Sequence, residues 1–481
     1  MLSSRTATAA FALVLVAAAP APAPPPPPPA PLQARVEAKL AEAGAGPRFG
    51  LVVAAEDGRE LVAIAPEGRF VPASTTKLFT VGTVFADLPG IEAADATGGA
   101  AVWLEGKQNA RPDVVLEGHG DARLSSAADC REDCLAALAD AVAARMRKVR
   151  DVIGDDGAFP DQRWSPGMSW NNMATESGTA VSALTLDDNE LALVVTAAAP
   201  GQAPHVETPT YYTLRNDAST VAASQPSTLD VERLPGSRLL RLTGTIPAGA
   251  TPQRLRLGID DPADYAASRL AALLAARGVR VTGKVAVRHR SGAAPPSQAG
   301  RILVAKLTPP PLLLDLRRTM KASQNLHAEL LLRRLGATTG TGSIADGLTA
   351  VRAALSRAGI SERAVDLSDG SGMSTYNRVT PRGVVAWLRW AAGQPWGGAW
   401  RATLPVGGVD GTLARRFRGG PLEGRISAKT GTLNQTSALA GYLVARSGRT
   451  LTFAAYANDI PQGVGAAKAM DAALELIAAE N

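Results

Sequence analysis

Strand-like and helical patterns at the two ends of the chain place the strongest constraint on its fold. Two strand-like runs follow a helical stretch at 34–43, and three more precede a helical stretch at about 464–479. The five strand-like runs are 49–55, 61–65, 424–432, 438–446 and 451–457. One antiparallel sheet flanked by helices, built from both chain ends, is the economical arrangement and predicts an α+β fold.

The long middle of the chain differs from both ends in its pattern of strand-like runs and turns. From about 93 to 305 it carries short strand-like runs between turns rich in Gly, Pro, Asp and Thr. A chain of 481 residues has room for two or three domains. We therefore predict one domain from 34–92 and 306–481, an inserted domain from 93–191 and 261–305, and a β-rich domain nested in it at 192–260.

The N-terminal segment predicts export. Arg5 precedes an apolar run at 9–19, and only proline and alanine follow from 20 to 31. This pattern is typical of a secretory signal peptide, assigned to 1–23, followed by a stiff Pro-rich linker at 24–33. An uncleaved membrane anchor is the alternative. Because no later stretch reaches about 18 uninterrupted apolar residues, we expect at most peripheral attachment to a membrane.

The chain has two cysteines, Cys130 and Cys134. Export brings them into an oxidising compartment, which permits a local disulfide. A spacing of four strains the geometry on a straight helix, whereas a turn would suit it. The sequence leaves this pairing open.

Several kinds of function lack their sequence signals. The net charge is only +6, and no basic stripe is interleaved with aromatic residues, which argues against nucleic-acid binding. The four histidines form no H-E-x-x-H motif and no Cys/His cluster, so we expect no metal and no organic cofactor. Neither a G-x-S-x-G nucleophile elbow nor a Walker A loop is present.

Three short motifs in a fixed order instead indicate an active serine served by a lysine base. Ser74-Thr75-Thr76-Lys77 comes first, at the start of a helical pattern. The spacing puts Ser74 and Lys77 on one helix face, where the amine can serve as general base if burial lowers its pKa. The N–H of Ser74, in the first helical turn, is available for an oxyanion hole.

The other two motifs supply the polar groups that such a site needs. In Ser323-Gln324-Asn325, the serine can relay a proton and the asparagine can hold the lysine, although both residue types also favour helix N-caps. In the strand-like 429–432, Lys429 offers a positive charge for a carboxylate, and Thr430 and Thr432 offer hydroxyl donors. We expect Gly431 to let a substrate backbone approach closely, along an edge strand.

Four further segments accompany these motifs: 117–121, 182–184 with 188–189, 369–374 and 404–413. Together with the motifs they make the chain resemble the class C low-molecular-mass penicillin-binding proteins, a D-alanyl-D-alanine carboxypeptidase/endopeptidase family. The resemblance implies a transpeptidase-like domain, an antiparallel sheet flanked by helices, interrupted by a large insertion that contains a nested β-rich domain.

The resemblance also implies a role for each motif residue. Ser74 is expected to be the nucleophile and Lys77 its base, with N–H groups of Ser74 and Thr432 forming the oxyanion hole. The implied catalytic residues are Ser74, Lys77, Ser323, Asn325 and Lys429. The implied substrate-binding residues are Thr430, Gly431, Thr432, Asp155, Phe159 and Asn434.

Two of those positions come from the insertion, and one departs from the family pattern. Asp155 and Phe159 match residues that contribute to a pocket for the stem-peptide amine in relatives. Asn434 stands where some relatives carry glutamine, and Thr375 where some carry arginine. These departures concern contacts to the side-chain end of the peptide.

The resulting expectation is an exported serine DD-peptidase of the periplasmic or extracellular cell-wall space. It would cleave peptidoglycan stem peptides through an acyl-enzyme on Ser74 and would be acylated by β-lactams. A β-lactamase and a catalytically silent wall-binding protein are the alternatives. The sequence does not choose between carboxypeptidase and endopeptidase activity, and it leaves the stem-peptide diamino acid and the oligomeric state open, a homodimer included.

Overall fold

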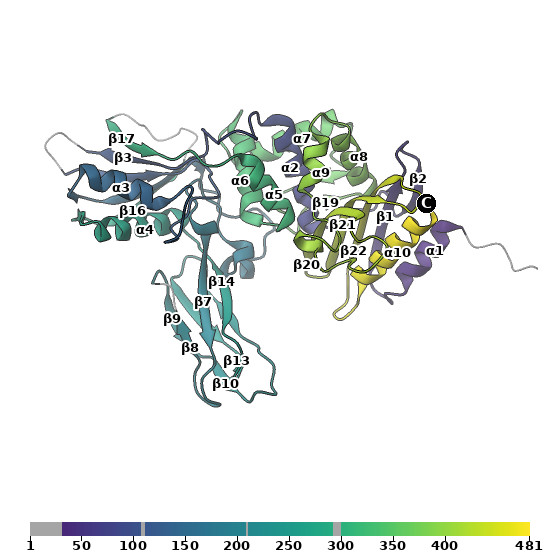
Figure 1. Cartoon of the computed structure of the whole chain (residues 1–481), viewed down its shortest axis with the longest axis horizontal. Helices are drawn as coiled ribbons and strands as arrows, with labels where there is room; N and C mark the ends of the chain where they lie inside the picture. Colours follow the sequence, from purple (N-terminus) through teal and green to yellow (C-terminus); the bar gives the residue numbers. More distant parts are fainter. Residues whose placement is uncertain (1–30, 107–110, 208–209, 292–299) are drawn as a thin grey trace, which may run out of the picture.

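The computed structural model describes residues 31–106, 111–207, 210–291 and 300–481 (Figure 1). The predicted signal peptide and residues 24–30 of the predicted Pro-rich linker lie outside the described residues. Within the described ranges, no helix combines the length and apolar character needed to cross a membrane.

Both chain ends form one five-stranded antiparallel sheet, in the order β2-β1-β22-β21-β20. Its strands are β1 (Arg48–Ala54), β2 (Glu60–Ile64), β20 (Ile426–Leu433), β21 (Thr436–Val444) and β22 (Thr450–Asn458). The prediction of one sheet from both ends is confirmed, with boundaries displaced by one or two residues. The sheet leaves β20 at its edge.

Helices cover both faces of this sheet. Leu51 and Val53 point to the face covered by α1 (Leu32–Ala41) and α10 (Ala466–Glu480), while Val52 and Ala54 point to the opposite core. Figure 1 shows α1 and α10 side by side at the end of the molecule that carries the C-terminus. Because both faces are buried, the central strands read as nearly continuous apolar runs.

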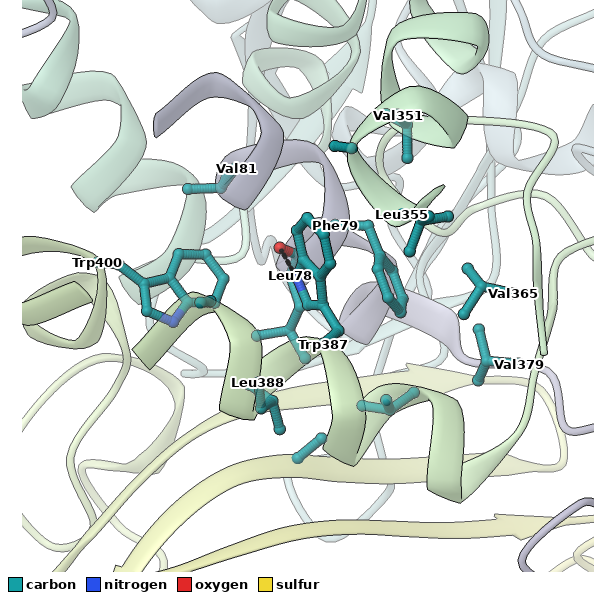
Figure 2. Close-up of a cluster of buried hydrophobic side chains, with 14 of the residues drawn as sticks. Leu78, Phe79, Val81, Val351, Leu355, Val365, Val379, Trp387, Leu388 and Trp400 are labelled. Carbon is teal, nitrogen blue, oxygen red and sulfur yellow. Dashed lines mark hydrogen bonds between the residues drawn. The ribbon is translucent and has the colours of Figure 1, made fainter. Parts of the chain in front are cut away.

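The opposite face carries a helical layer around α2 (Lys77–Asp87), nine of whose eleven residues are buried. Around it lie α5 (Leu312–Lys321), α6 (Asn325–Ala337), α7 (Ile344–Arg357), α8 (Pro381–Ala392) and α9 (Gly397–Thr403). Figure 2 shows Leu78, Phe79 and Trp387 in the core that joins α2 to α8. The Trp387 indole Nε1 donates to the Leu78 carbonyl at 2.9 Å, which fixes α2 against α8.

The middle of the chain forms a separate five-stranded sheet, in the order β16-β6-β4-β3-β17. Its strands are β3 (Ala101–Glu105), β4 (Asp113–Glu117), β6 (Val152–Pro160), β16 (Val285–Arg290) and β17 (Arg301–Lys306). Two helices, α3 (Leu135–Arg145) and α4 (Pro262–Ala276), share a buried apolar cluster with it.

Short strands between β6 and α4 form an arm that projects away from both larger sheets (Figure 1). They are β7 (Glu190–Thr196), β8 (His205–Glu207), β9 (Thr213–Asn216), β10 (Ser219–Val221), β11 (Asp230–Glu232), β12 (Leu239–Thr243), β13 (Thr245–Pro247) and β14 (Gln253–Gly258). The predicted limit 192 lies within β7, the first of these strands, and 260 lies two residues after the end of β14, the last. The three-domain division itself stays a proposal.

The two cysteines lie in the turn that leads into α3. Cys134 is the residue just before this helix, and a disulfide joins it to Cys130. A turn satisfies the geometric condition that a straight helix would not, so the structure decides a question that the sequence left open.

Candidate active site

The three motifs meet where α2, α6 and the edge strand β20 converge. Ser74 lies in a 3₁₀ turn, Ala73–Thr76, that runs directly into α2. The amine Nζ of Lys77 donates to Ser74 Oγ at 2.9 Å and to Asn325 Oδ1 at 2.7 Å. From β20, Lys429 Nζ donates to Ser323 Oγ at 2.8 Å. Segments far apart in the chain thus join in one polar cluster.

Lys77 has the surroundings of a base. Its side chain is fully buried, and burial lowers its pKa from 10.5 to about 7, opposed in part by the negative charges of Asp369 and Glu329. Nζ makes a third hydrogen bond, which it donates to the Ser371 carbonyl at 2.6 Å. At neutral pH, a large fraction of this amine is therefore in the free-base form that can take up a proton.

The backbone is strained just before the first motif serine, Ser74, and at the second, Ser323. Ala73 and Ser323 adopt positive φ values of 48° and 61°, a region that non-glycine residues seldom occupy. Gly372 packs on the first of them, and a Cβ at Gly372 would lie 1.9 Å from the Ala73 carbonyl oxygen. Gly372 itself has φ of 90°, so only glycine fits this position beside Ser74.

The segment 369–374, which the sequence marked as family-like, is the loop that holds Gly372 in place. The carboxylate of Asp369 accepts the N–H groups of Gly372 at 2.9 Å and Ser374 at 2.6 Å, and the amide of Asn377 at 2.7 Å. Asp369 is almost completely buried. Its role is to shape the loop that supports the serine and the lysine.

Lys429 is the second fully buried lysine of the site. Burial, together with the neighbouring charge of Lys77, lowers its pKa well below the usual value. Besides Ser323 it reaches the Thr430 carbonyl at 3.0 Å. The hydroxyls of Thr430 and Thr412 lie 2.7 Å apart, so the segment 404–413 supports the third motif through Thr412.

The chain's own backbone packs closely against Gly431. A Cβ there would lie 2.6 Å from the Pro72 carbonyl oxygen and 3.2 Å from the Ala73 side chain. The backbone just before Ser74 therefore already requires a glycine here, and the approach of a substrate to Gly431 stays a prediction. Thr432 and Asn434, in contrast, are exposed on the edge strand and in the turn after it.

Asp155 and Phe159 lie on β6 and have partners other than the serine and lysine cluster. The carboxylate of Asp155 is buried between Arg288, at 3.0 Å, and Arg301, at 2.9 Å. Phe159 packs against Gly120 and belongs to an apolar cluster that includes residues of α6. A role for Asp155 in an amine pocket would compete with its two ion pairs, and for both residues that role stays a prediction.

Sequence reasoning missed Glu329 and gave no role to Asp369 or Thr412. Glu329 follows Asn325 by four residues on α6 and is buried beside the loop 369–374. An i, i+4 relation to a motif residue was the available signal, because such residues share a helix face. Among the described residues, no group of His, Cys, Asp and Glu is arranged to hold a metal ion.

Comparison with known proteins places this geometry in a family. The model of the D-Ala-D-Ala carboxypeptidase 3 (S13) family matches residues 32–481. A D-alanyl-D-alanine carboxypeptidase of Actinomadura sp. (strain R39) is 34% identical over 409 residues, covering 82% of this chain and 74% of that protein. The DacB carboxypeptidase of Haemophilus influenzae is 26% identical over 325 residues, covering 65% of this chain and 66% of that protein.

The fold also has a solved counterpart. The crystal structure of penicillin binding protein 4 (dacB) from Haemophilus influenzae superposes with a TM-score of 0.77 at 23% sequence identity. The superposition covers 91% of this chain and 96% of that one. A second crystal structure of the same protein, complexed with a β-lactam, gives a TM-score of 0.73. The α+β fold with its nested β-rich arm is thus the fold of these structures.

Proposed function

Because the chain belongs to the D-Ala-D-Ala carboxypeptidase 3 (S13) family, we propose that Ser74 is the nucleophile with which it cleaves D-Ala-D-Ala peptides. The protein is a serine-type D-alanyl-D-alanine carboxypeptidase; the proposal concerns which residues do this chemistry. Ser74 Oγ attacks the carbonyl carbon between the two D-alanines. An ester to the enzyme forms, the terminal D-alanine leaves as an amine, and water then hydrolyses the ester.

One observation carries the assignment of Lys77 as the base. Its Nζ touches three oxygens, and two of them, Asn325 Oδ1 and the Ser371 carbonyl, can only accept hydrogen bonds. A free-base amine has two N–H groups and one lone pair. In the free base, the two pure acceptors take both N–H groups. The ammonium's donation to Ser74 is then replaced by the lone pair, which faces the Ser74 hydroxyl and can remove its proton during attack.

The remaining motif residues would serve the substrate and the leaving group. Lys429 donates to Ser323 Oγ, so Ser323 would pass its hydroxyl hydrogen to the departing amine and take a replacement proton from the Lys429 ammonium. The N–H groups of Ser74 and Thr432 would bind the developing oxyanion. Lys429, Thr430 and Thr432 would bind the carboxylate of the terminal D-alanine.

The substrate and the location of the enzyme are part of the same proposal. We propose peptidoglycan stem peptides as the substrate and an exported location, on the support of the N-terminal sequence pattern. A β-lactam presents a strained amide to the same serine and would form the same type of ester, with its amine still tethered to the acyl group. Such an adduct would be long-lived.

The test is intact-mass spectrometry of the protein during incubation with benzylpenicillin, with peptide mapping of any adduct. We expect one persistent adduct on Ser74, none in Ser74→Ala, and an unchanged adduct in Ser447→Ala, which alters an exposed serine of a distant turn. In parallel, release of D-alanine from a peptide ending in D-Ala-D-Ala should disappear only in Ser74→Ala.

Other outcomes would change the assigned function or the assigned nucleophile. A fleeting adduct with rapid hydrolysis of the antibiotic would indicate a β-lactamase. Neither an adduct nor D-alanine release would indicate a wall-binding protein that keeps the fold without the chemistry. An adduct mapped to another serine would contradict the proposed nucleophile.

A further inference from the structure

The buried carboxylate of Glu329 contacts the same residue, Ser371, that accepts a hydrogen bond from Lys77, and the mechanism proposed above does not use it. Glu329 lies one helical turn after Asn325 on α6, and only 6% of the residue is exposed. Burying a carboxylate without partners costs several kcal/mol, so its contacts indicate what it does.

Those contacts lead directly to Lys77. Glu329 Oε1 accepts the N–H groups of Gly370 at 3.1 Å and Ser371 at 2.9 Å. On its other side, the Ser371 carbonyl accepts Lys77 Nζ at 2.6 Å. The second carboxylate oxygen, Oε2, accepts the hydroxyl of Ser165 at 3.4 Å. One residue, Ser371, therefore lies between the carboxylate and the amine.

This support matters because of what Ser371 does for the base. Its carbonyl is one of the two pure acceptors that aim the lone pair of Lys77 at Ser74. If this carbonyl moved, the free amine could turn an N–H toward Ser74 and leave its lone pair pointing elsewhere. Two hydrogen bonds from adjacent N–H groups to a single carboxylate oxygen hold this stretch of backbone in place.

We propose that Glu329 is a positioning residue for Lys77: it fixes the Ser371 carbonyl against the amine, and its charge is coupled to the charge of the amine. The inference rests on the function proposed above. It assigns Glu329 no contact with substrate.

The electrostatic setting of Glu329 gives the sign of the coupling. Burial, and then the negative charge of Asp369, raise the pKa of Glu329 to about 7, while hydrogen bonding by Ser371 and the cation of Arg333 oppose the rise. Lys77 faces it across the Ser371 peptide and is itself faced by Lys429. An ionised Glu329 stabilises the ammonium form of Lys77, so removing its charge should make the free base available at lower pH.

The decisive variant is Glu329→Gln, assayed by the second-order rate of acylation by benzylpenicillin from about pH 5 to about pH 10. The glutamine oxygen can still accept both N–H groups, and its amide can donate to Ser165. We expect the acid limb of the profile to move by about one pH unit toward lower pH, with the plateau within about threefold of wild type.

A second variant separates the two parts of the role. Glu329→Asp keeps the charge, but its shorter side chain moves the carboxylate oxygens away from the N–H groups of Gly370 and Ser371. The acylation rate should therefore fall by about tenfold or more at every pH, while the acid limb of the profile stays at the wild-type pH. Asp471→Asn is the matched control. It neutralises another largely buried carboxylate, paired with Arg416 on the far face of the sheet. This variant should change neither the pH of the acid limb nor the acylation rate.

The outcomes distinguish this inference from the proposed function. Wild-type profiles for both Glu329 variants, or a Glu329→Gln rate that falls equally at all pH values without a shift, would overturn it. Failure of the wild-type protein to acylate would instead overturn the function on which it rests. Thermal unfolding of each variant shows that rates are compared between folded proteins, and if Glu329→Gln does not fold, wild-type rates in Glu329→Asp suffice to refute the positioning role.

Discussion

A negative charge placed beside Lys77 should switch off the base at neutral pH and allow it to recover in alkali. Asn325 offers the place, because its Oδ1 lies 2.7 Å from Lys77 Nζ and its Nδ2 donates to the Ser177 carbonyl at 2.9 Å. Asn325→Asp keeps the size and the acceptor oxygen. It exchanges the neutral amide for a carboxylate, which favours the ammonium form of the lysine.

The size of the effect follows from the geometry. Two unit charges about 4 Å apart, at an effective dielectric constant of about 20, interact by about 4 kcal/mol, or about three pKa units. Burial of the new carboxylate and loss of the bond to Ser177 offset part of this, so we expect a rise of about two units. The pKa of Lys77 would move from about 7 to about 9. Its free-base fraction at pH 7 would then fall from about one half to about one hundredth.

The acylation rate with benzylpenicillin as a function of pH measures this shift. The variant should lose about 50-fold at pH 7 and regain most of that loss near pH 10, because alkali restores the free amine. Asn325→Ala provides the comparison, since it removes the acceptor without adding charge and should show no alkaline recovery. A rate in Asn325→Asp that stays low at every pH, or an acid limb still near pH 7, would refute Lys77 as the base.

Three other substitutions test parts of the site and the fold. Gly372→Ala should lower the acylation rate by more than about 100-fold and the unfolding free energy by about 2 kcal/mol or more, because the new Cβ meets the Ala73 carbonyl just before Ser74. Stopped-flow kinetics and urea denaturation measure the two effects, and wild-type values for both would contradict the strained backbone. Thr412→Val removes the hydroxyl that contacts Thr430, so KM for a D-Ala-D-Ala peptide should rise about fivefold with a smaller change in kcat, while Thr412→Ser should restore it. Replacing Cys130 and Cys134 together by serine should cost about 2 kcal/mol of stability or less, because the closed loop is short, and should leave activity unchanged; a loss of activity would show that this turn influences the site.

Much of the local structure was open to prediction from the sequence. Alternating and continuous apolar runs located the five strands of the terminal sheet, and the spacing of Ser74 and Lys77 placed both on one turn. Ser323 and Asn325 both favour helix N-caps by residue type, but neither caps α6. Gln324 does, because its side chain accepts the Leu326 N–H. These features depend on neighbours within a few residues, which is why a single sequence carries them.

The sequence by itself determined which residue types carry the chemistry, and the tertiary structure decided how they act. Glu329 and Thr412 have their hydrogen-bond partners on other segments, and Gly431 packs against the chain before Ser74. The depressed pKa of Lys77 likewise comes from burial, which no local pattern specifies. Helix and strand periods are set by adjacent residues, whereas desolvation and long-range hydrogen bonds exist only after distant segments have packed together.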